Sequence, residues 1–269
     1  MPAARDGAMA TFAGQLRAWR AARSWSQAGL AGTIGYSDSL VSGIENAQKI
    51  PTADFAARCD GAFETPGTFA ALQELVSREA WPTYFGPVLD FEKDAVRIHE
   101  WEMRVVPGML QAKEYARAVI SAGQPGLGDA ELDRKVAGRL ARQEILAQDK
   151  PPLYWAVIGE AALRQRVGGP GVMRGQLDKL IEVAQRQRVV IQVLPFAATD
   201  NPGSDGPLVI YDLAEGTSAA YCECKGGGMV VESPDAVGDL VTTMGMIRAL
   251  SLPPRESADM LRRIRNDHD

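Results

Sequence analysis

The sequence has few of the residues that build disulfide frameworks or metal centres. It contains three cysteines and two histidines in 269 residues, and an odd cysteine count gives no disulfide pattern. Cys222 and Cys224 would share one face of a strand, which can suggest metal or redox chemistry, but no suitably spaced third and fourth ligand accompanies them. We therefore expect inert thiols, no bound metal and no cofactor.

Long apolar runs and an excess of positive charge are also missing. No apolar stretch approaches the roughly 20 residues that a membrane-spanning helix needs, and no basic-then-apolar leader opens the chain. With the cysteine usage, this predicts a cytoplasmic protein without a membrane partner. The formal net charge of −5 argues against a surface built for non-specific nucleic-acid binding, although one docking face can still be locally positive.

Apolar residues are plentiful enough for a folded protein of two domains. Hydrophobic residues make up 46% of the chain and charged residues 23%, so it can bury a core. The length suits a domain of roughly 70 residues followed by one of typical single-core size. We predict a loose leader at residues 1–10, with Met9 as an alternative start, a first domain at 11–80, a linker at 81–90 and a second domain at 91–269.

The first domain has the apolar spacing of an all-α fold. Phe12, Leu16 and Trp19 lie on one helical face from Thr11 onward. Ser26 is a candidate N-cap, and Gly35 stands where a left-handed residue would end a helix. Further helices are expected at residues 27–34, 38–46, 51–63 and 68–80.

Two of these helices carry the pattern of a helix-turn-helix. The pattern needs four inward apolar residues, one small residue where the helices cross and a glycine at the turn, and the sequence supplies Leu30, Ile34, Val41, Ile44, Ala31 and Gly35. Arg17 and Arg20 resemble the "L-R-x-x-R" first helix of lambda-repressor-like (Xre-family) domains. The segment from Glu45 to Pro51 resembles their "E-N-G-K-x-P" exit. The resemblance implies a five-helix domain whose second motif helix enters the major groove of an operator.

The resemblance also implies which side chains contact DNA. The phosphate contacts, which fix register without reading sequence, would come from Gln27, Ser37, Asn46 and Lys49. The base contacts would come from Asp38, Ser39 and Ser42, because serine pairs with several bases and aspartate accepts from cytosine. The alternative is a helical hairpin that only packs against another element.

The first domain also departs from this family pattern. Gly29, Gly32 and Gly43 lie inside motif helices, where each costs about 1 kcal/mol relative to alanine, and Gly43 leaves a usual base-reading position empty. Between Thr11 and Ala80 there are six basic and seven acidic side chains. DNA-binding domains are usually more positive, so we expect DNA binding that is weak, dependent on a dimer, or lost.

The second domain is predicted to be a mixed α+β fold with a small sheet and flanking helices. β-branched and aromatic clusters between turn signals predict strands at residues 153–158, 189–194, 208–213 and 218–224. Helices are expected at 91–104, 113–122, 129–148, 159–166, 170–188, 234–250 and 254–265. Glycine-rich segments at 168–171 and 226–228 lack the lysine of a phosphate loop, so we interpret them as turns.

Several separate strings in this domain resemble one known family. They include Val106-Pro107-Gly108-Met109-Leu110-Gln111, Arg139-Leu140-Ala141-Arg142-Gln143, Glu160-Ala161-Ala162-Leu163-Arg164 and Val193-Leu194-Pro195-Phe196. They are similar to the C-terminal domain of actinobacterial antitoxin-like transcriptional regulators of the Xre family. The resemblance implies sensing, dimerisation, or binding of a small partner protein encoded nearby.

Five residues of the second domain are candidates for contacting a small ligand. Convergent carboxylates and aromatic rings can line a pocket for a cationic or polar molecule, and the candidates are Glu100, Trp101, Glu160, Tyr221 and Glu223. Each also has a structural explanation, because a helix start favours Glu160 and a tryptophan such as Trp101 usually packs in a core.

The sequence leaves two functions open. The favoured one is a homodimeric, sequence-specific DNA-binding transcriptional regulator whose second domain receives a partner protein or ligand. The alternative is a degenerate helix-turn-helix scaffold whose second domain binds a small molecule or has acquired catalysis, with Glu100, Glu160 and Glu223 as acid or base groups. A histidine-based triad would depend on His99, and no nucleophile elbow supports it. The enzyme question therefore stays open, with a non-enzyme favoured.

Overall fold

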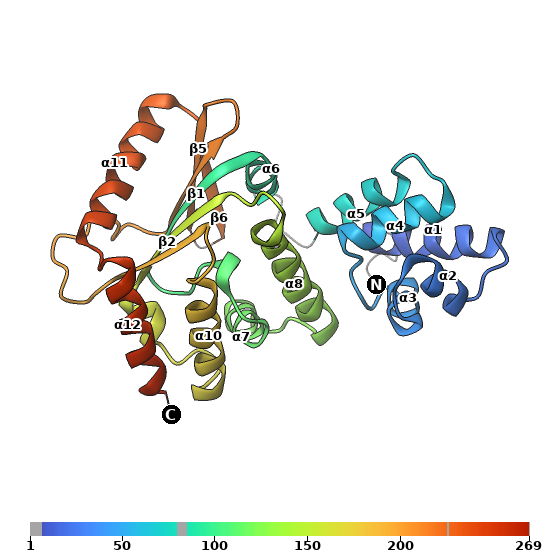
Figure 1. Ribbon diagram of the computed structural model, residues 1–269, viewed down its shortest axis with the longest axis horizontal. Helices are drawn as coiled ribbons and strands as arrows, with labels where there is room; N and C mark the ends of the chain where they lie inside the picture. The colour runs from blue at the N-terminus through green and yellow to red at the C-terminus, as the bar shows by residue number, and fades with distance from the viewer. Residues whose placement is uncertain (1–6, 80–84, 225, 269) are drawn as a thin grey trace. The chain divides into compact units, whose positions relative to one another are not determined.

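The computed structural model describes residues 7–79, 85–224 and 226–268. The chain divides into two compact units (Figure 1). The first contains Met1–Thr83 and the segment Gly128–Ala141, and the second contains Tyr84–Leu127 and Arg142–Asp269. The two units are described separately below.

The N-terminal helices of the first unit form the predicted all-α bundle. They are α1 (Ala8–Ala22), α2 (Gln27–Ile34), α3 (Asp38–Glu45), α4 (Ala53–Phe63) and α5 (Thr68–Glu79), and α8 (Asp129–Arg142) contributes the later segment of this unit. Expected helix 68–80 ends within one residue of α5, and Ala80 lies outside the described residues.

The predicted loose leader at residues 1–10 is wrong for its last three residues. Helix α1 begins at Ala8, and Met9 is buried in the core of the bundle. The carboxylate of Glu79 accepts hydrogen bonds from the backbone N–H of Ala8, with 2.8 Å to each oxygen. An acidic group at a helix N-terminus is favourable, so a residue about 70 positions away sets the start of this helix.

The bundle encloses an apolar core that the sequence pattern anticipates. Phe12 and Leu16 of α1 are fully buried, and the rings of Phe12 and Phe69 lie edge to face at 5.5 Å between centroids. The core also contains the inward residues of the helix-turn-helix, namely Leu30, Ala31, Ile34, Val41 and Ile44.

The second unit is built on one six-stranded sheet in the order β3-β2-β1-β4-β5-β6. Strands β1, β2 and β3 are parallel to one another, and β4, β5 and β6 continue the sheet in antiparallel pairs. Their bounds are β1 (Ala95–Glu102), β2 (Leu153–Gly159), β3 (Val189–Leu194), β4 (Leu208–Leu213), β5 (Ser218–Cys224) and β6 (Gly227–Val231). The mixed α+β prediction is confirmed.

The expected helix at residues 91–104 is wrong beyond Asp94. Helix α6 (Gly86–Asp94) occupies the second half of the expected linker at 81–90 and the first four residues of this expected helix, and residues from Ala95 form β1 at the centre of the sheet. The run from Ala95 to Glu102 contains β-branched and aromatic residues, and β1 pairs with β2 on one side and with β4 on the other. Two ladders of backbone hydrogen bonds override a local helical pattern, because β-propensity depends strongly on context.

The prediction of a turn at residues 226–228 is correct only for Gly226. Gly226 has φ +85°, whereas Gly227 and Gly228 belong to edge strand β6. A Cβ on Gly228 would lie 2.0 Å from the Tyr221 hydroxyl oxygen. The glycine is therefore needed where the Tyr221 side chain crosses β6, which is a close approach rather than a turn.

Helices α11 (Pro234–Leu250) and α6 cover opposite faces of the sheet (Figure 1). Met244 and Ile247 of α11 pack with Trp101 and Ile210, while Phe91 of α6 contacts the ring of Tyr211, on the other face. The remaining helices are α7 (Lys113–Gly123), α9 (Glu160–Arg164), α10 (Pro170–Val183) and α12 (Pro254–Asn266), with 3₁₀ helices at Gly108–Leu110 and Gln143–Ala147. No helix among the described residues is both long and apolar enough to span a membrane.

Candidate DNA-binding surface and ligand site

Side-chain caps and one left-handed glycine set the two helices of the helix-turn-helix. The Ser26 hydroxyl accepts a hydrogen bond from Gly29 N at 3.0 Å, and the Ser37 hydroxyl accepts one from Leu40 N at 3.3 Å. Gly35, between the helices, has φ +75°. These contacts satisfy N–H groups that a helix start leaves open, and they confirm both predicted caps and the predicted glycine.

The N-terminal end of α3 presents small polar side chains to solvent. Ser37, Asp38 and Ser39 are exposed, and the two serine hydroxyls lie 3.1 Å apart. One carboxylate oxygen of Asp38 accepts a hydrogen bond from Ser39 N at 2.8 Å, which leaves the other oxygen for an outside donor. Farther along α3, Ser42 is half-buried and lies 3.4 Å from the exposed Asn46 amide.

A buried carboxylate joins α1, α2 and α3. Glu45 is 2% exposed and accepts hydrogen bonds from Arg20 Nε at 2.6 Å, Arg20 Nη2 at 3.0 Å and Gln27 Nε2 at 2.7 Å. Burial acts to raise the pKa of Glu45, but these hydrogen bonds and the charges of Arg20 and Arg17 outweigh burial, so its pKa lies below the usual value. Gln27 is therefore held in place, with the second hydrogen of its amide nitrogen still available for a phosphate.

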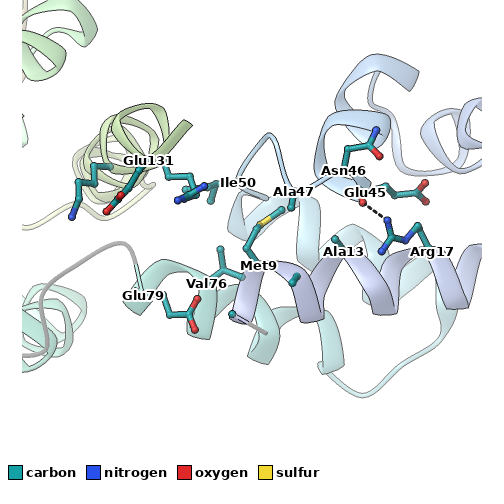
Figure 2. A pocket seen from close by; sticks show the side chains of 14 residues that line it. Met9, Ala13, Arg17, Glu45, Asn46, Ala47, Ile50, Val76, Glu79 and Glu131 are labelled. Atoms are coloured by element: carbon teal, nitrogen blue, oxygen red, sulfur yellow. Dashed lines mark hydrogen bonds between the residues drawn. The ribbon is translucent and has the colours of Figure 1, made fainter. Parts of the chain in front are cut away.

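Arg17 also contacts Glu45, but at the backbone carbonyl group of Glu45 and not at its carboxylate. Its Nη1 donates to the carbonyl oxygen of Glu45 at 2.8 Å (Figure 2). Figure 2 also shows Met9 and Ala13 on the same helix, beside Ala47. The guanidinium of Arg17 is thus fixed at the C-terminal end of α3, where carbonyl groups favour a cation.

Gly43 does not leave a base-reading position empty, contrary to the sequence-based interpretation. It is buried, and an added Cβ would lie 2.9 Å from Cδ and 3.0 Å from Cγ of Lys49. The aliphatic part of Lys49 therefore crosses α3 at Gly43. Long cationic side chains commonly bury their stems in this way and keep the charged end in water.

Most cations of the first 80 residues are committed to internal contacts. Arg20 pairs with Glu45, Arg58 with Asp54 at 2.7 Å and Arg78 with Glu74 at 3.3 Å. Arg23 lies 3.7 Å from a Glu64 oxygen. Lys49 has no carboxylate partner among the residues that the structure describes.

Most acidic side chains of the domain also make internal contacts, and Asp38 is the exception described above. The carboxylate of Asp60 accepts hydrogen bonds from Phe69 N at 2.8 Å and Ala70 N at 2.9 Å, and it also bonds the Thr65 hydroxyl. It therefore caps the first turn of α5, as Glu79 caps α1. The acidic count reflects helix capping and ion pairing more than an acidic docking face.

The five candidate ligand residues of the second unit do not converge on one site. Glu100 and Trp101 are neighbours in β1, so their side chains point to opposite faces of the sheet. Trp101 packs in the core under α11, and its indole N–H donates to the Gly203 carbonyl at 2.8 Å. The strand register places Tyr221 and Glu223 on the Glu100 face.

Glu160 lies apart from this group and makes structural contacts. It is buried at the start of α9, where its carboxylate accepts hydrogen bonds from Phe196 N at 2.8 Å and Arg164 Nε at 2.6 Å. These contacts join α9 to the loop after β3. These contacts agree with a structural role for Glu160 at a helix start, and not with a ligand pocket shared with the other four candidates.

The Glu100 face contains a buried polar cluster that sequence reasoning missed. Arg142 Nε donates to both carboxylate oxygens of Glu92, at 2.8 and 2.6 Å, and the Tyr154 hydroxyl donates to Glu100. Burial raises the pKa of Glu100 to about 6, against the opposing effects of the Arg142 charge and the Tyr154 hydrogen bond. These residues come from α6, α8, β1 and β2. They are far apart in the sequence, so no short sequence motif predicts the cluster.

His99 does not form the catalytic arrangement that a histidine-based triad would need. Its Nε2 lies 3.1 Å from Asp212 Oδ2, and its Nδ1 contacts Arg248 Nη2. The Ser218 hydroxyl donates to Asp212 at 2.9 Å rather than to the histidine. Burial, followed by the charge of Arg248, lowers the pKa of His99. Both ring nitrogens are engaged, so this group positions β1, β4 and α11 relative to one another.

Comparison with family models agrees with the two-part organisation. Residues 11–72 match a model described as a helix-turn-helix domain, which places the chain in the class of helix-turn-helix DNA-binding regulators. Residues 85–263, more than half of the chain, match the model of the domain of unknown function DUF5753. The chain belongs to the DUF5753 family. No curated protein and no solved structure matches it.

Proposed function

We propose that this chain is a sequence-specific transcriptional regulator that inserts α3 into the major groove of an operator. The observation that carries the proposal is the exposed polar end of α3, where Ser37, Asp38 and Ser39 precede the first buried residue of that helix. A helix presented by a tight turn, with its N-terminal side chains free of the core, suits major-groove reading.

In this proposal, base contacts and phosphate contacts come from different residues. Asp38 accepts a hydrogen bond from a cytosine amine through its second oxygen, and Ser39 and Ser42 contact neighbouring base edges. Gln27, Ser37, Asn46 and Lys49 bind phosphates on either side. The small number of uncommitted cations favours weak binding by one chain.

Dimerisation would compensate for this weakness. We infer that the second unit holds two copies together, so that two α3 helices contact half-sites about one duplex turn apart on a palindromic operator. Sedimentation of the full-length protein, with and without operator DNA, measures this directly. A monomer at all concentrations and on DNA would contradict it.

We further propose that the second unit receives a signal, either a small partner protein or a cationic or polar ligand. Glu100, Tyr221 and Glu223 are the candidate contacts, because the strand register gives them one face of the sheet. A buried carboxyl with a raised pKa supports a functional role at such a position. Glu100→Gln should weaken ligand binding and leave DNA binding by the ligand-free protein unchanged.

The experiment that tests DNA binding is fluorescence anisotropy with duplex DNA from upstream of its own gene, over a range of salt concentrations. Asp38→Asn should cost about 1–3 kcal/mol and relax the preference at one base pair. Lys49→Gln should weaken binding to all duplexes alike. Arg78→Gln is the matched control, because it removes the same charge from α5, where Arg78 pairs with Glu74.

A second function has one specific observation in its favour. Each described arginine before residue 80 makes an internal contact, namely Arg17, Arg20, Arg23, Arg58 and Arg78. If these contacts are their main role, the helix-turn-helix is a scaffold and the second unit binds a small molecule or performs catalysis. Absence of duplex binding by the wild type at low salt would select this function. Duplex binding whose affinity falls steeply with salt concentration would instead support the transcriptional regulator.

A further inference from the structure

Three sulfur-containing side chains lie on one face of the hairpin formed by β5 and β6. Cys222 of β5 is the register partner of Met229 of β6, and Cys224 is the partner of Gly227. Side chains two residues apart on a strand share a face, and so do directly opposite residues on paired strands. Cys222, Cys224 and Met229 therefore form one sulfur cluster.

The pairing of β5 with β6 brings the backbone positions of these three residues close together. Directly opposite residues have Cβ atoms about 4.5–5.5 Å apart, and residues two apart on a strand are separated by roughly 6.5 Å. The Cys224 sulfur lies over the Gly227 position, because a Cβ added there would be 3.9 Å from Sγ. Apart from this sulfur, no described atom outside residues 226–228 lies within 4 Å of a Cβ added at Gly227.

The cluster is accessible from solvent at its outer end. Met229 is 60% exposed and Cys224 is exposed, while Cys222 is half-buried against the core under α11. Both cysteines are free thiols, so neither sulfur is committed to a disulfide.

The chemistry of this donor set selects the type of ion. Thiolate and thioether sulfurs are soft ligands that favour Cu(I), whereas structural zinc sites require four nitrogen, sulfur or carboxylate ligands. Among the described residues, no group of three or more histidine, cysteine, aspartate or glutamate side chains is arranged to hold a metal. Glu223, between the two cysteines, points to the opposite face of the sheet.

We propose that Cys222, Cys224 and Met229 form a binding site for Cu(I), with two thiolate ligands and one thioether ligand. Binding releases the two thiol protons, because the metal takes the thiolate form of each cysteine. The ion's single positive charge and the two thiolates leave a complex of net charge −1. This proposal is independent of DNA binding, and either can fail without the other.

The test is transfer of Cu(I) from a chromophoric chelator to the full-length protein under anaerobic conditions. Wild-type protein should take up one Cu(I) per chain. Cys222→Ser and Cys224→Ser should each weaken binding by more than the roughly 100-fold that loss of an outer-shell partner can cost. Met229→Leu should cause a smaller loss, because a thioether is a neutral ligand.

Matched controls are available for both residue types. Cys59→Ala removes the third cysteine, which is fully buried in the first unit, and should leave Cu(I) uptake unchanged. Met246→Leu alters another exposed methionine, 53% exposed on α11, and should also have no effect. Far-ultraviolet circular dichroism and thermal melts confirm that each variant is folded before its binding is compared.

Three outcomes would overturn the proposal. Uptake that survives in both cysteine variants would place the metal elsewhere. If Met229→Leu and Met246→Leu bind Cu(I) with equal affinity, the Met229 thioether is not a ligand. Tighter binding of Zn(II) than of Cu(I) in the same competition would contradict the assignment to a soft monovalent ion.

Discussion

Replacing Glu45 by glutamine tests whether the helix-turn-helix depends on one buried carboxylate. The substitution keeps the shape of the side chain but removes the charge that Arg20 and Gln27 contact. Arg20, whose side chain is 19% exposed, would then be left with a neutral partner between α1 and α3. The free energy of unfolding of the first unit should fall.

The expected size of this fall follows from the burial of the pair. Breaking a buried ion pair by removing one partner costs about 3–5 kcal/mol, and the partial exposure of Arg20 favours the lower end, about 3 kcal/mol. A domain of roughly 70 residues has a total stability of about 4–10 kcal/mol. The substitution therefore removes about 30% or more of the stability of this unit.

Hydrogen exchange of the full-length protein measures this change in α1–α5 separately from the second unit. A loss of about 3 kcal/mol raises the opening constant by about two powers of ten. Glu64→Gln is the control, because Glu64 is 83% exposed and lies 3.7 Å from Arg23, so its effect should stay within about 0.5 kcal/mol. If the backbone amides of α1–α5 exchange at the same rates in Glu45→Gln and Glu64→Gln, the reasoning is wrong.

Acid should reproduce part of the Glu45 effect. The pKa of Glu45 is lowered in the folded state, so its contribution is present at neutral pH, above the pKa of the unfolded chain. That contribution is lost as the pH falls through the lowered pKa. Exchange in α1–α5 should accelerate on acidification in the wild type and change less in Glu45→Gln.

Three further substitutions probe other parts of the molecule. The pKa of Glu100 is raised from 4.5 to about 6, so the free energy of unfolding falls by about 2 kcal/mol as the pH rises from about 4.5 to about 6. Urea unfolding should show that Glu100→Gln gains stability at pH 7.5 but not at pH 4.5, and equal effects at both would refute this. Lys49→Gln should reduce the salt dependence of DNA binding by about one unit of slope, as anisotropy titrations can show, and an unchanged slope would exclude a phosphate contact. Gly228→Ala should cost about 1–3 kcal/mol by overpacking, because its Cβ would meet the Tyr221 hydroxyl at 2.0 Å; Gly227→Ala, with its nearest atom at 3.9 Å, is the control in thermal melts.

The sequence predicted the elements whose cause is local. Ser26 and Ser37 cap their helices, and Gly35 ends α2 in the left-handed region, because each effect involves residues within one helical turn. Strands β3, β4 and β5 have the predicted bounds, since β-branched residues between turn signals identify them without knowledge of their partners.

The tertiary structure alone decided which side chains meet. Strand β1 replaces an expected helix because ladders on both sides hold it in the sheet, and this change puts Glu100 and Trp101 on opposite faces. The contacts of Arg20 with Glu45 and of Arg142 with Glu92 join residues 25 and 50 positions apart. Met229 comes beside Cys222 only through the register of β5 with β6. Helix caps and strand identity are set by neighbours along the chain, whereas a site is set by strand order and register, which depend on the packing of the whole unit.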